Sequence, residues 1–300
     1  MKSIFAIIVT YNPDLPVLQS QLQTLRGLGG VILVENASKN VDGILEMVSR
    51  TDSGIIDVIR NETNVGLAIA QNQGIEQARA RNASHIILFD QDSIPERSMI
   101  ENLLDAERQL LGKGVKVGAI GPVTFDPDSG KEYPITRYRG PVIQRYFTRP
   151  HELAEASFII ASGSLVRMDV LDQVGGMLEP LFIDYIDVEW CYRVQSLGYM
   201  LYVAADARMS HRVGDKRVNV FGRSISQHSA LRRYYLTRNS LYVLRLAHIP
   251  LGYKIREITL NFARFLAFLY FSDERARYLK YVGQAVVDGV QGNYGKIKER

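Results

Sequence analysis

The chain has 300 residues, of which 46% are hydrophobic and 23% charged, enough for one large globular domain or a domain with an appendage. Its one cysteine, Cys191, excludes an internal disulfide and a cysteine-based metal cluster, and it fits a reducing compartment. The net charge of +4 conceals an asymmetry, because residues 1–200 carry 18 basic and 25 acidic side chains and residues 201–300 carry 18 and 7. The basic last third indicates contact with something anionic: phosphate groups, a membrane surface or nucleic acid.

The first hundred residues alternate between strand and helix patterns. Strands are expected at 4–12, 31–38, 55–64 and 85–93, and helices at 15–28, 41–50 and 66–81. We interpret the N-terminal "MKSIFAIIVTYNP" as the first strand and not as a signal peptide. The alternation predicts an α/β protein with a mostly parallel sheet and helices on both faces.

Polar residues follow each of these four strands. They are Thr10-Tyr11-Asn12, Glu35-Asn36, Asn61 to Asn64 and Asp90-Gln91-Asp92. In open parallel sheets, ligands bind beyond the carboxyl ends of the strands. The sequence therefore predicts one site where these polar segments converge.

The rest of the chain is less regular. A strand and turn are expected at 117–130, a flexible loop or hairpin at 131–157, two short strands and then a helix ending at Gly175-Gly176 within 157–176, a helix at 186–199, a strand at 200–211, and helix from about residue 224 onward. No stretch of 18 or more uncharged apolar residues occurs, so no membrane-spanning helix is expected.

Two clusters of acidic residues could carry chemistry. Asp90 and Asp92 follow a buried strand, where unpaired carboxylates are costly; they could cap a turn, or bind Mg²⁺ or Mn²⁺ together with substrate phosphates. The second cluster lies near the start of a helix and contains Asp184, Asp187 and Glu189. The helix dipole stabilises negative charge at that end of a helix. The alternative for this second cluster is a general base whose pKa is raised by apolar neighbours.

The third cluster is basic. Arg232, Arg233 and Arg238 would suit a diphosphate, or could form a solvated helix face. His211 begins the basic segment 211–217, and His228 begins the segment 228–239. A single histidine is more often structural than metal-binding.

The order of the motifs "IVTYNP", "VENAS", "NVGLAIAQNQGI", "FDQDS", "ASGSLVRMDVLDQVGGM" and "FIDYIDVEWCYR" resembles inverting nucleotide-sugar glycosyltransferases of family two. The resemblance covers about the first 215 residues. It implies a GT-A fold, a Rossmann-like, mostly parallel sheet flanked by helices, with a catalytic domain at 1–215 and a basic, apolar helical region at 216–300. The segment "HSALRRYYLTRNSLYVLR" resembles the bacterial rhamnosyltransferase branch, which builds O-antigen or capsule-type polysaccharide from dTDP-L-rhamnose.

The resemblance also implies roles for individual residues. Nucleotide-sugar contacts would come from Thr10, Tyr11, Asn12, Asn36, Asn64, Gly66, Asn72, Asp90, Gln91, Arg232 and Arg233. The acceptor would be bordered by Ser162, Gly163, Ser164, Asp184, Glu189 and Trp190. Asp92 and His211 would bind Mg²⁺ or Mn²⁺, and Asp187 would be the catalytic base. Two positions depart from the family: Ile186 stands where a Glu precedes the base, and Asn36 where many members have Asp.

The sequence gives less support to other functions. A dinucleotide-dependent oxidoreductase would need G-x-G-x-x-G after the first strand, and a nucleotidyltransferase a glycine-rich basic loop; neither occurs. No aromatic and basic RNA motif is present, so no nucleic acid partner is expected. A non-catalytic nucleotide-sugar-binding or assembly subunit remains open because of Ile186, as does a UDP-sugar donor.

The segment 251–271, "LGYKIREITLNFARFLAFLYF", is strongly apolar but contains Lys254, Arg256, Glu257 and Arg264. A helix of this kind could dock on the catalytic core or form a homodimer. Alternatively, it could lie in a membrane interface with its arginines at the lipid phosphates. We therefore expect a cytoplasmic protein, with peripheral contact at the cytoplasmic face of the inner membrane where a lipid-linked oligosaccharide acceptor would lie.

Overall fold

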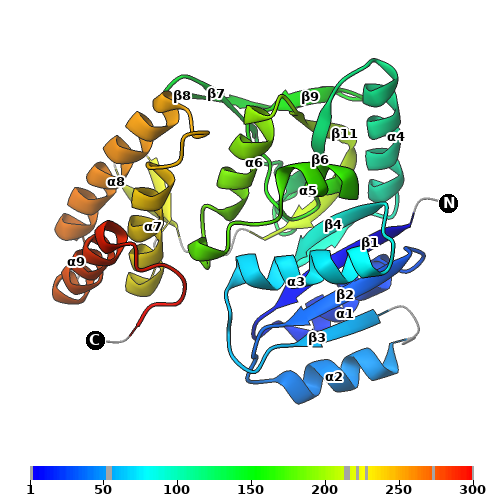
Figure 1. Ribbon diagram of the computed structural model, residues 1–300, viewed down its shortest axis with the longest axis horizontal. Coiled ribbons are helices and arrows are strands. Elements are labelled where there is room, and N and C mark those ends of the chain that lie inside the picture. Colours follow the sequence, from blue (N-terminus) through cyan, green and yellow to red (C-terminus); the bar gives the residue numbers. More distant parts are fainter. Residues whose placement is uncertain are drawn as a thin grey trace.

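The computed structural model describes residues 3–51, 56–212, 217–220, 223–226, 229–271 and 274–298. Its centre is a nine-stranded sheet (Figure 1). The strands are β1 (Ile4–Thr10), β2 (Gly30–Glu35), β3 (Ile56–Arg60), β4 (His85–Asp90), β5 (Ser93–Pro95), β6 (Val117–Phe125), β9 (Leu153–Ala156), β10 (Leu165–Arg167) and β11 (Met200–His211). Their order is β3-β2-β1-β4-β10-β6-β11-β5, with β9 paired to β11. The predicted α/β class is confirmed.

The first four strands run parallel, as the sequence predicts. In the register of the sheet, Ile8 lies opposite Leu33 of β2 and Phe89 of β4. These strands carry nearly continuous apolar runs because both faces of a parallel sheet are covered by helices. Their carboxyl ends consequently open at one edge, and the polar segments converge there.

Helices cover the two faces of the sheet. They are α1 (Leu15–Thr24), α2 (Val41–Arg50), α3 (Leu67–Ala80), α4 (Met99–Gly112), α5 (Met168–Val174) and α6 (Ile186–Ser196). Adjacent residues of β1 point to opposite faces: Ile7 packs in the core with α3, α5 and α6, and Ile8 in the core with α1, α2 and α4. The sheet therefore lies between two separately packed helical layers.

The middle of the chain differs in part from the prediction. The expected loop or hairpin at 131–157 contains the hairpin β7 (Ile135–Arg139) and β8 (Val142–Tyr146). The prediction of two strands within 157–176 was wrong, because among its residues only β10 is a strand of the sheet. Residues 161–164 instead form a turn in which the N–H of Gly163 (φ 82°) donates to the carbonyl of Leu88. This turn brings the segment to the end of β4.

The prediction of helix from residue 224 was also wrong at its start. Residues 217–220 and 223–226 form an antiparallel strand pair, β12 (Arg217–Val220) and β13 (Arg223–Ser226). Helix α7 (Ala230–Val243) begins after it, where the Ser229 hydroxyl accepts the N–H of Arg232, as an N-cap does. The predicted domain division at residue 215 and His228 lie outside the described residues.

The chain ends in three helices at one end of the molecule, α7, α8 (Leu251–Phe271) and α9 (Arg275–Gln291) (Figure 1). Phe182, Tyr234, Tyr235 and Ala285 form a small apolar core between α7, α9 and the segment before α6. Helix α8 meets the β7–β8 hairpin, where Tyr138 and Tyr253 pack edge to face at 5.4 Å. Within the described parts of the chain, no helix combines the length and hydrophobicity needed to cross a bilayer.

Candidate active site

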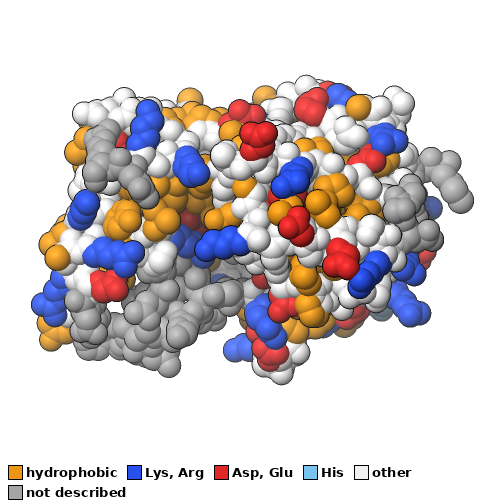
Figure 2. Space-filling model, turned by 90° about the horizontal axis from the view of Figure 1, so that it is seen from below, with side chains coloured by type: hydrophobic (Ala, Val, Ile, Leu, Met, Phe, Trp, Pro, Cys, Tyr) orange, Lys and Arg blue, Asp and Glu red, His pale blue; other side chains and the backbone are white. Residues whose placement is uncertain are grey.

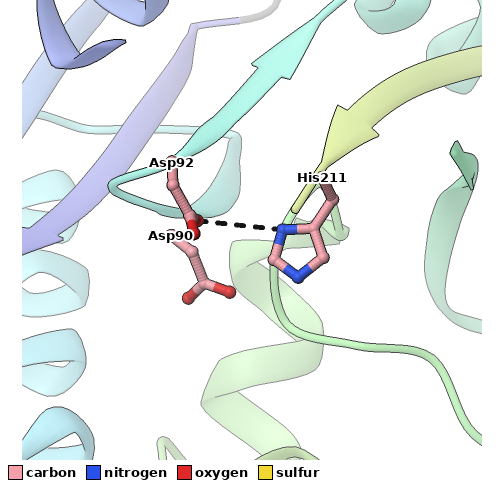
Figure 3. A group of neighbouring side chains, drawn as sticks. All are labelled: Asp90, Asp92 and His211. Carbon is pink, nitrogen blue, oxygen red and sulfur yellow. Dashed lines mark ion pairs between the residues drawn. The ribbon is translucent and has the colours of Figure 1, made fainter. Parts of the chain in front are cut away.

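Asp90, Asp92 and His211 converge at the carboxyl edge of the sheet (Figure 3). Each offers one ligand atom, and these atoms lie within 4.8 Å of one another. Nδ1 of His211 is 3.8 Å from Oδ1 of Asp92, because β5 pairs with β11 and sets Ser93 opposite His211. Two carboxylates and an imidazole suit Mg²⁺ or Mn²⁺. We refer to these three residues as the acidic trio.

Polar side chains behind the acidic trio hold it in place. The Ser93 hydroxyl hydrogen bonds with Nδ1 of His211 at 2.8 Å. The Ser162 hydroxyl donates to Ser93 at 2.8 Å and accepts the N–H of Asp90 at 3.0 Å. The amide of Gln21, a buried residue of α1, donates to the carbonyls of Asp90 and Ser93 at 2.7 and 2.6 Å. The sequence analysis did not predict Gln21 or Ser93. The position of Gln21 next to Leu22 on the apolar face of α1, which also includes Leu18, could have indicated a buried amide with polar partners.

The charges within the acidic trio favour a cation. Burial raises the pKa of Asp90, the negative charge of Asp92 raises it further, and His211 opposes both. A divalent cation would relieve the repulsion between the two carboxylates. The donor set and its spacing therefore fit the metal expected from the sequence, without distinguishing Mg²⁺ from Mn²⁺.

Asp187 lies at the start of α6. Burial raises its pKa to about 6; the charges of Asp90 and Asp184 raise it too, and the N–H of Val188, which donates to Oδ1 at 3.0 Å, opposes them. A carboxylate with such a pKa is well suited to accept a proton near neutral pH. Asp187 therefore has the electrostatic character predicted for the catalytic base.

The residues after β1 lie next to the acidic trio. The N–H of Tyr11 donates to Oε1 of Gln91 at 2.7 Å, and the Gln91 amide donates back to the Tyr11 carbonyl at 3.3 Å. The N–H of Asn12 donates to the Ser38 hydroxyl, while the buried Thr10 hydroxyl finds no hydrogen-bond partner among the residues that the structure describes. The Tyr11 side chain is 47% exposed, so its ring is available to a ligand.

A second polar group orders the loop between β3 and α3. The Asn36 amide donates to Asn64 at 3.2 Å and its carbonyl accepts the N–H of Val65 at 3.0 Å, while Asn64 accepts the N–H of Gly66. Gly66 has φ 92°, and a Cβ there would lie 2.5 Å from the ring of Phe182. Only glycine fits this close approach.

A cavity of about 610 Å³ lies beside this loop. It is lined by Glu35, Ala37, Ser38, Val41, Arg60, Asn61 and Glu62. One carboxylate oxygen of the buried Glu35 accepts the N–H of Ser38, and the other has no hydrogen-bond partner within the described ranges. Of these residues, Ser38 and Arg60 carry polar side chains that the sequence analysis did not single out.

Several predicted site residues have their polar groups occupied by structural partners. Both ends of the Asn72 amide bind the backbone of Met177. Glu189 is 1% exposed and forms an ion pair with Arg193, and the Trp190 indole donates to the Gly175 carbonyl. The structure does not bring these three side chains to the acidic trio, and their binding roles stay predictions.

The serines predicted at the acceptor divide between two positions. Ser162 reaches the acidic trio, as described above, whereas the Ser164 hydroxyl donates to the Ile160 carbonyl within the turn. Gly163, between them, provides the backbone bend. The acceptor roles of these residues are also left as predictions.

The basic residues of α7 have three different environments. Arg232 forms an ion pair with Asp184 at 3.0 Å, Arg233 is buried, and Arg238 is fully buried. The Arg238 guanidinium donates to Asn239 and to the Gly295 carbonyl. The suggestion that Arg238 suits a diphosphate was therefore wrong, because its donors hold the C-terminal segment.

Comparison with known proteins identifies the family. A model described as Glycosyl transferase family 2 matches residues 5–175. The dTDP-rhamnosyl transferase RfbF of Shigella flexneri is 33% identical over 299 residues, 98% of this chain and 97% of that protein. The family model includes Asp90 and Asp92 but ends before His211. The match to the relative also extends through His211 and the C-terminal helices.

Solved structures show the same fold at low sequence identity. GalNAc-T7 with UDP, GalNAc and Mn²⁺ matches with a TM-score of 0.59 at 13% identity, over 98% of this chain and 58% of that one, so this chain spans a little over half of its length. The mannosyltransferase PcManGT of Pyrobaculum calidifontis, with GDP-Man and Mn²⁺, matches with a TM-score of 0.55 at 14% identity. The match covers 97% of this chain and 88% of that one. S. aureus TarS with UDP-GlcNAc matches with a TM-score of 0.57 at 15% identity, over 97% of this chain and 82% of that one. With the predicted GT-A arrangement thus confirmed and the family model covering more than half of the sequence, this chain belongs to glycosyltransferase family 2.

Proposed function

We propose that this glycosyltransferase moves L-rhamnose from dTDP-L-rhamnose, with inversion, onto a glycan or lipid-linked glycan acceptor in cell-surface polysaccharide synthesis. The observation that carries the proposal is the raised pKa of Asp187, a buried carboxyl on which the charge of Asp90 in the acidic trio acts. The choice of donor is supported by the activity named for the S. flexneri relative.

In the proposed reaction, Asp187 takes the proton of the acceptor hydroxyl while that oxygen attacks the anomeric carbon. The new carbon–oxygen bond forms opposite the bond to the diphosphate, whose electrons leave with the nucleotide, so one displacement inverts the configuration. Asp92 and His211, with Asp90, would hold Mg²⁺ or Mn²⁺, which when bound supplies positive charge to the departing diphosphate. Ser93, Ser162 and Gln21 position these ligands.

The nucleotide would lie along the edge formed by Thr10 to Asn12 and Asn36. The cavity beside Glu35 is next to this edge and has room for a base, and the exposed Tyr11 ring could stack on it. We further propose that residues 1–215 bind both substrates and that the helical region 216–300 completes the acceptor side.

The donor is tested with the full-length protein. Thermal shifts are measured with dTDP, dTDP-L-rhamnose and UDP-sugars, each with and without Mn²⁺ or Mg²⁺, and nucleoside diphosphate release is measured with glycan and lipid-linked acceptors. Ligand binding should stabilise the protein by about 2.7 kcal/mol at a hundred times Kd, with the thymidine nucleotides and metal giving the largest shift. Equal shifts with UDP-sugars would refute the donor, and binding without turnover of any acceptor would favour a non-catalytic subunit.

We also propose that α8 lies on the cytoplasmic face of the inner membrane, near a lipid-linked acceptor. Apolar side chains 49–75% exposed recur every three or four residues along its outer face: Leu251, Ile255, Ile258, Phe262, Leu266 and Tyr270. We call this the outer stripe of α8. A continuous apolar face of this period indicates an amphipathic surface helix.

The charge around the outer stripe favours anionic lipid over a second copy of the chain. The last hundred residues carry 18 basic and 7 acidic side chains. Hydrophobic and basic side chains lie together over the left part of Figure 2, where the C-terminal helices lie. Two such surfaces would repel one another, whereas anionic headgroups would attract them.

Co-sedimentation with vesicles tests this contact. The protein should bind vesicles of anionic lipid more strongly than neutral ones, and the double variant Ile258→Glu, Phe262→Glu should lose binding. Leu111→Glu, an exposed site on α4, is the matched control. Unchanged vesicle binding by the double variant would contradict the proposal. If the wild-type protein is a dimer and the double variant is a monomer, the outer stripe is instead a homodimer interface.

A further inference from the structure

Arg233 is a buried cation for which the described residues supply no counterion. It is 6% exposed, and its Nε is enclosed without a hydrogen-bond partner in this part of the chain. No carboxylate among the described residues forms an ion pair with it, whereas the neighbouring Arg232 pairs with Asp184 and Arg256 of α8 pairs with Glu257. An unpaired buried charge is costly, so this position calls for an anionic partner.

Arg264 of α8 approaches the same place. It follows Glu257 and Asn261 at spacings of seven and three residues, which puts the three on one helix face. This face is directed toward Tyr185, whose hydroxyl donates to Glu257 at 2.7 Å and also hydrogen bonds with Asn261. Arg264 is half-buried and, within the part of the chain that the structure describes, has neither an ion pair nor a side-chain hydrogen bond.

The two guanidinium groups act on one another. Burial lowers the pKa of Arg233, and the positive charge of Arg264 lowers it further, against the opposing effects of Tyr278, Tyr185 and Asp184. Two cations that repel each other in a partly enclosed space are stabilised when an anion lies between them. Both are arginines, whose planar guanidinium groups bind phosphate oxygens with two parallel hydrogen bonds.

Two contacts bring the helices of Arg233 and Arg264, the arginine pair, to the segment before Asp187. Arg232, next to Arg233, forms an ion pair with Asp184 at 3.0 Å, and Tyr185 donates to Glu257 on the face of α8 that carries Arg264. The charges acting on Asp90 are those of His211 and Asp92, whereas Arg233 is affected by Arg264 and Asp184. Asp187 is affected by Asp90 of the acidic trio and by Asp184, the partner of Arg232. Because the proposed function sets the donor diphosphate at the acidic trio, the arginine pair is left for the acceptor.

We propose that Arg233 and Arg264 bind a phosphate group of the acceptor, the phosphate or diphosphate that joins a glycan to a lipid carrier. The proposal rests on the proposed function, which sets the donor at the acidic trio. The phosphate contact would position the acceptor hydroxyl at Asp187. The lipid chain would then leave along α8, whose outer stripe begins on the opposite face of the same helix.

Steady-state kinetics separate the two substrates. In Arg264→Gln, KM should rise about tenfold or more for an acceptor linked to a short lipid by diphosphate, with little change for the matching alkyl glycoside without phosphate. The Kd of dTDP-L-rhamnose with Mn²⁺ should stay within about twofold. Lys254→Gln, which removes the same charge from the same helix, is the control and should leave all three values unchanged.

A binding measurement does not depend on the transferase activity. Farnesyl diphosphate, with chelator present to exclude metal, should stabilise the wild-type protein and Asp187→Asn equally in a thermal-shift assay. Arg264→Gln should lose this stabilisation, and Arg233→Lys should keep part of it because the charge remains. If the protein proves not to be a rhamnosyltransferase, this binding should still be observed.

Two results would overturn the proposal. A rise in the Kd of the donor equal to the rise in acceptor KM would assign the pair to the nucleotide diphosphate. Unchanged acceptor KM and unchanged farnesyl diphosphate binding in Arg264→Gln would show that the pair binds no phosphate. Because Arg264 is only half-buried, Arg264→Gln should fold even if a variant at the buried Arg233 does not.

Discussion

Replacing Asp187 by Asn should abolish turnover and at the same time stabilise the metal-free protein. The folded state raises the pKa of this carboxyl from 3.8 to about 6, so the folded chain holds its proton more tightly than the unfolded chain does. Stability therefore falls as pH rises from about 4 to about 6, and above that the ionised group costs a constant amount. A difference of about two pH units at 1.36 kcal/mol each gives an upper limit of about 3 kcal/mol.

Asparagine keeps the shape and can still accept the N–H of Val188, but it carries no charge. At pH 7.5, Asp187→Asn should raise the free energy of unfolding by up to about 3 kcal/mol, and near pH 3.5 it should change it little. Turnover should fall by on the order of a hundredfold or more, with the donor Kd retained. Chemical denaturation at the two pH values and nucleotide release measure these effects.

The pH dependence of the wild-type enzyme provides a second measurement. Turnover should decline as pH falls through about 6, because the protonated carboxyl of Asp187 cannot accept the proton of the acceptor. The reasoning would be refuted by near-normal turnover of Asp187→Asn. Destabilisation at pH 7.5 would also refute it, because the carboxylate would then be a structural group.

Three further changes test other parts of the site. Asp92→Asn should weaken Mn²⁺-dependent binding of dTDP by about tenfold or more in calorimetry; unchanged affinity would remove Asp92 from the metal site. Gly66→Ala should destabilise the protein by more than Gly27→Ala. Both glycines have positive φ, which is expected to cost alanine about 1–3 kcal/mol of strain at Gly27, but only Gly66 faces the Phe182 ring, whereas no atom lies within 4 Å of the Gly27 position. Equal losses of unfolding free energy in denaturation would contradict the clash at Gly66. Tyr185→Phe should cost about 1–3 kcal/mol, because Glu257 loses a buried donor, and no change in unfolding free energy would show that this bond contributes nothing.

Local patterns were enough for the first half of the fold. The runs around Ile8, Leu33 and Phe89 are apolar and bounded by polar turns, which fixes strand and helix type through short-range periodicity. The same patterns predicted that polar residues follow each strand, so the Asp90–Asp92 doublet was found before any contact was known. Family 2 followed from the order of these motifs.

The assembled site depends on contacts that no local pattern encodes. His211 joins Ser93 across 118 positions only because β5, three residues long, pairs with β11. A strand of that length has no detectable period. Gln21 likewise reaches Asp90 and Ser93 only when α1 packs on the sheet.

The sequence by itself determined the parallel α/β sheet, the family and the identity of the carboxylates, because each depends on residue type and near-neighbour spacing. The tertiary structure alone decided which charged groups have partners. Arg232, Arg233 and Arg238 are equivalent in the sequence. In the structure, one pairs with Asp184, one is buried with no counterion among the described residues, and one holds the C-terminal segment. Burial and the positions of opposite charges are set by packing between distant elements, which is why the arginine pair could be recognised only in the folded chain.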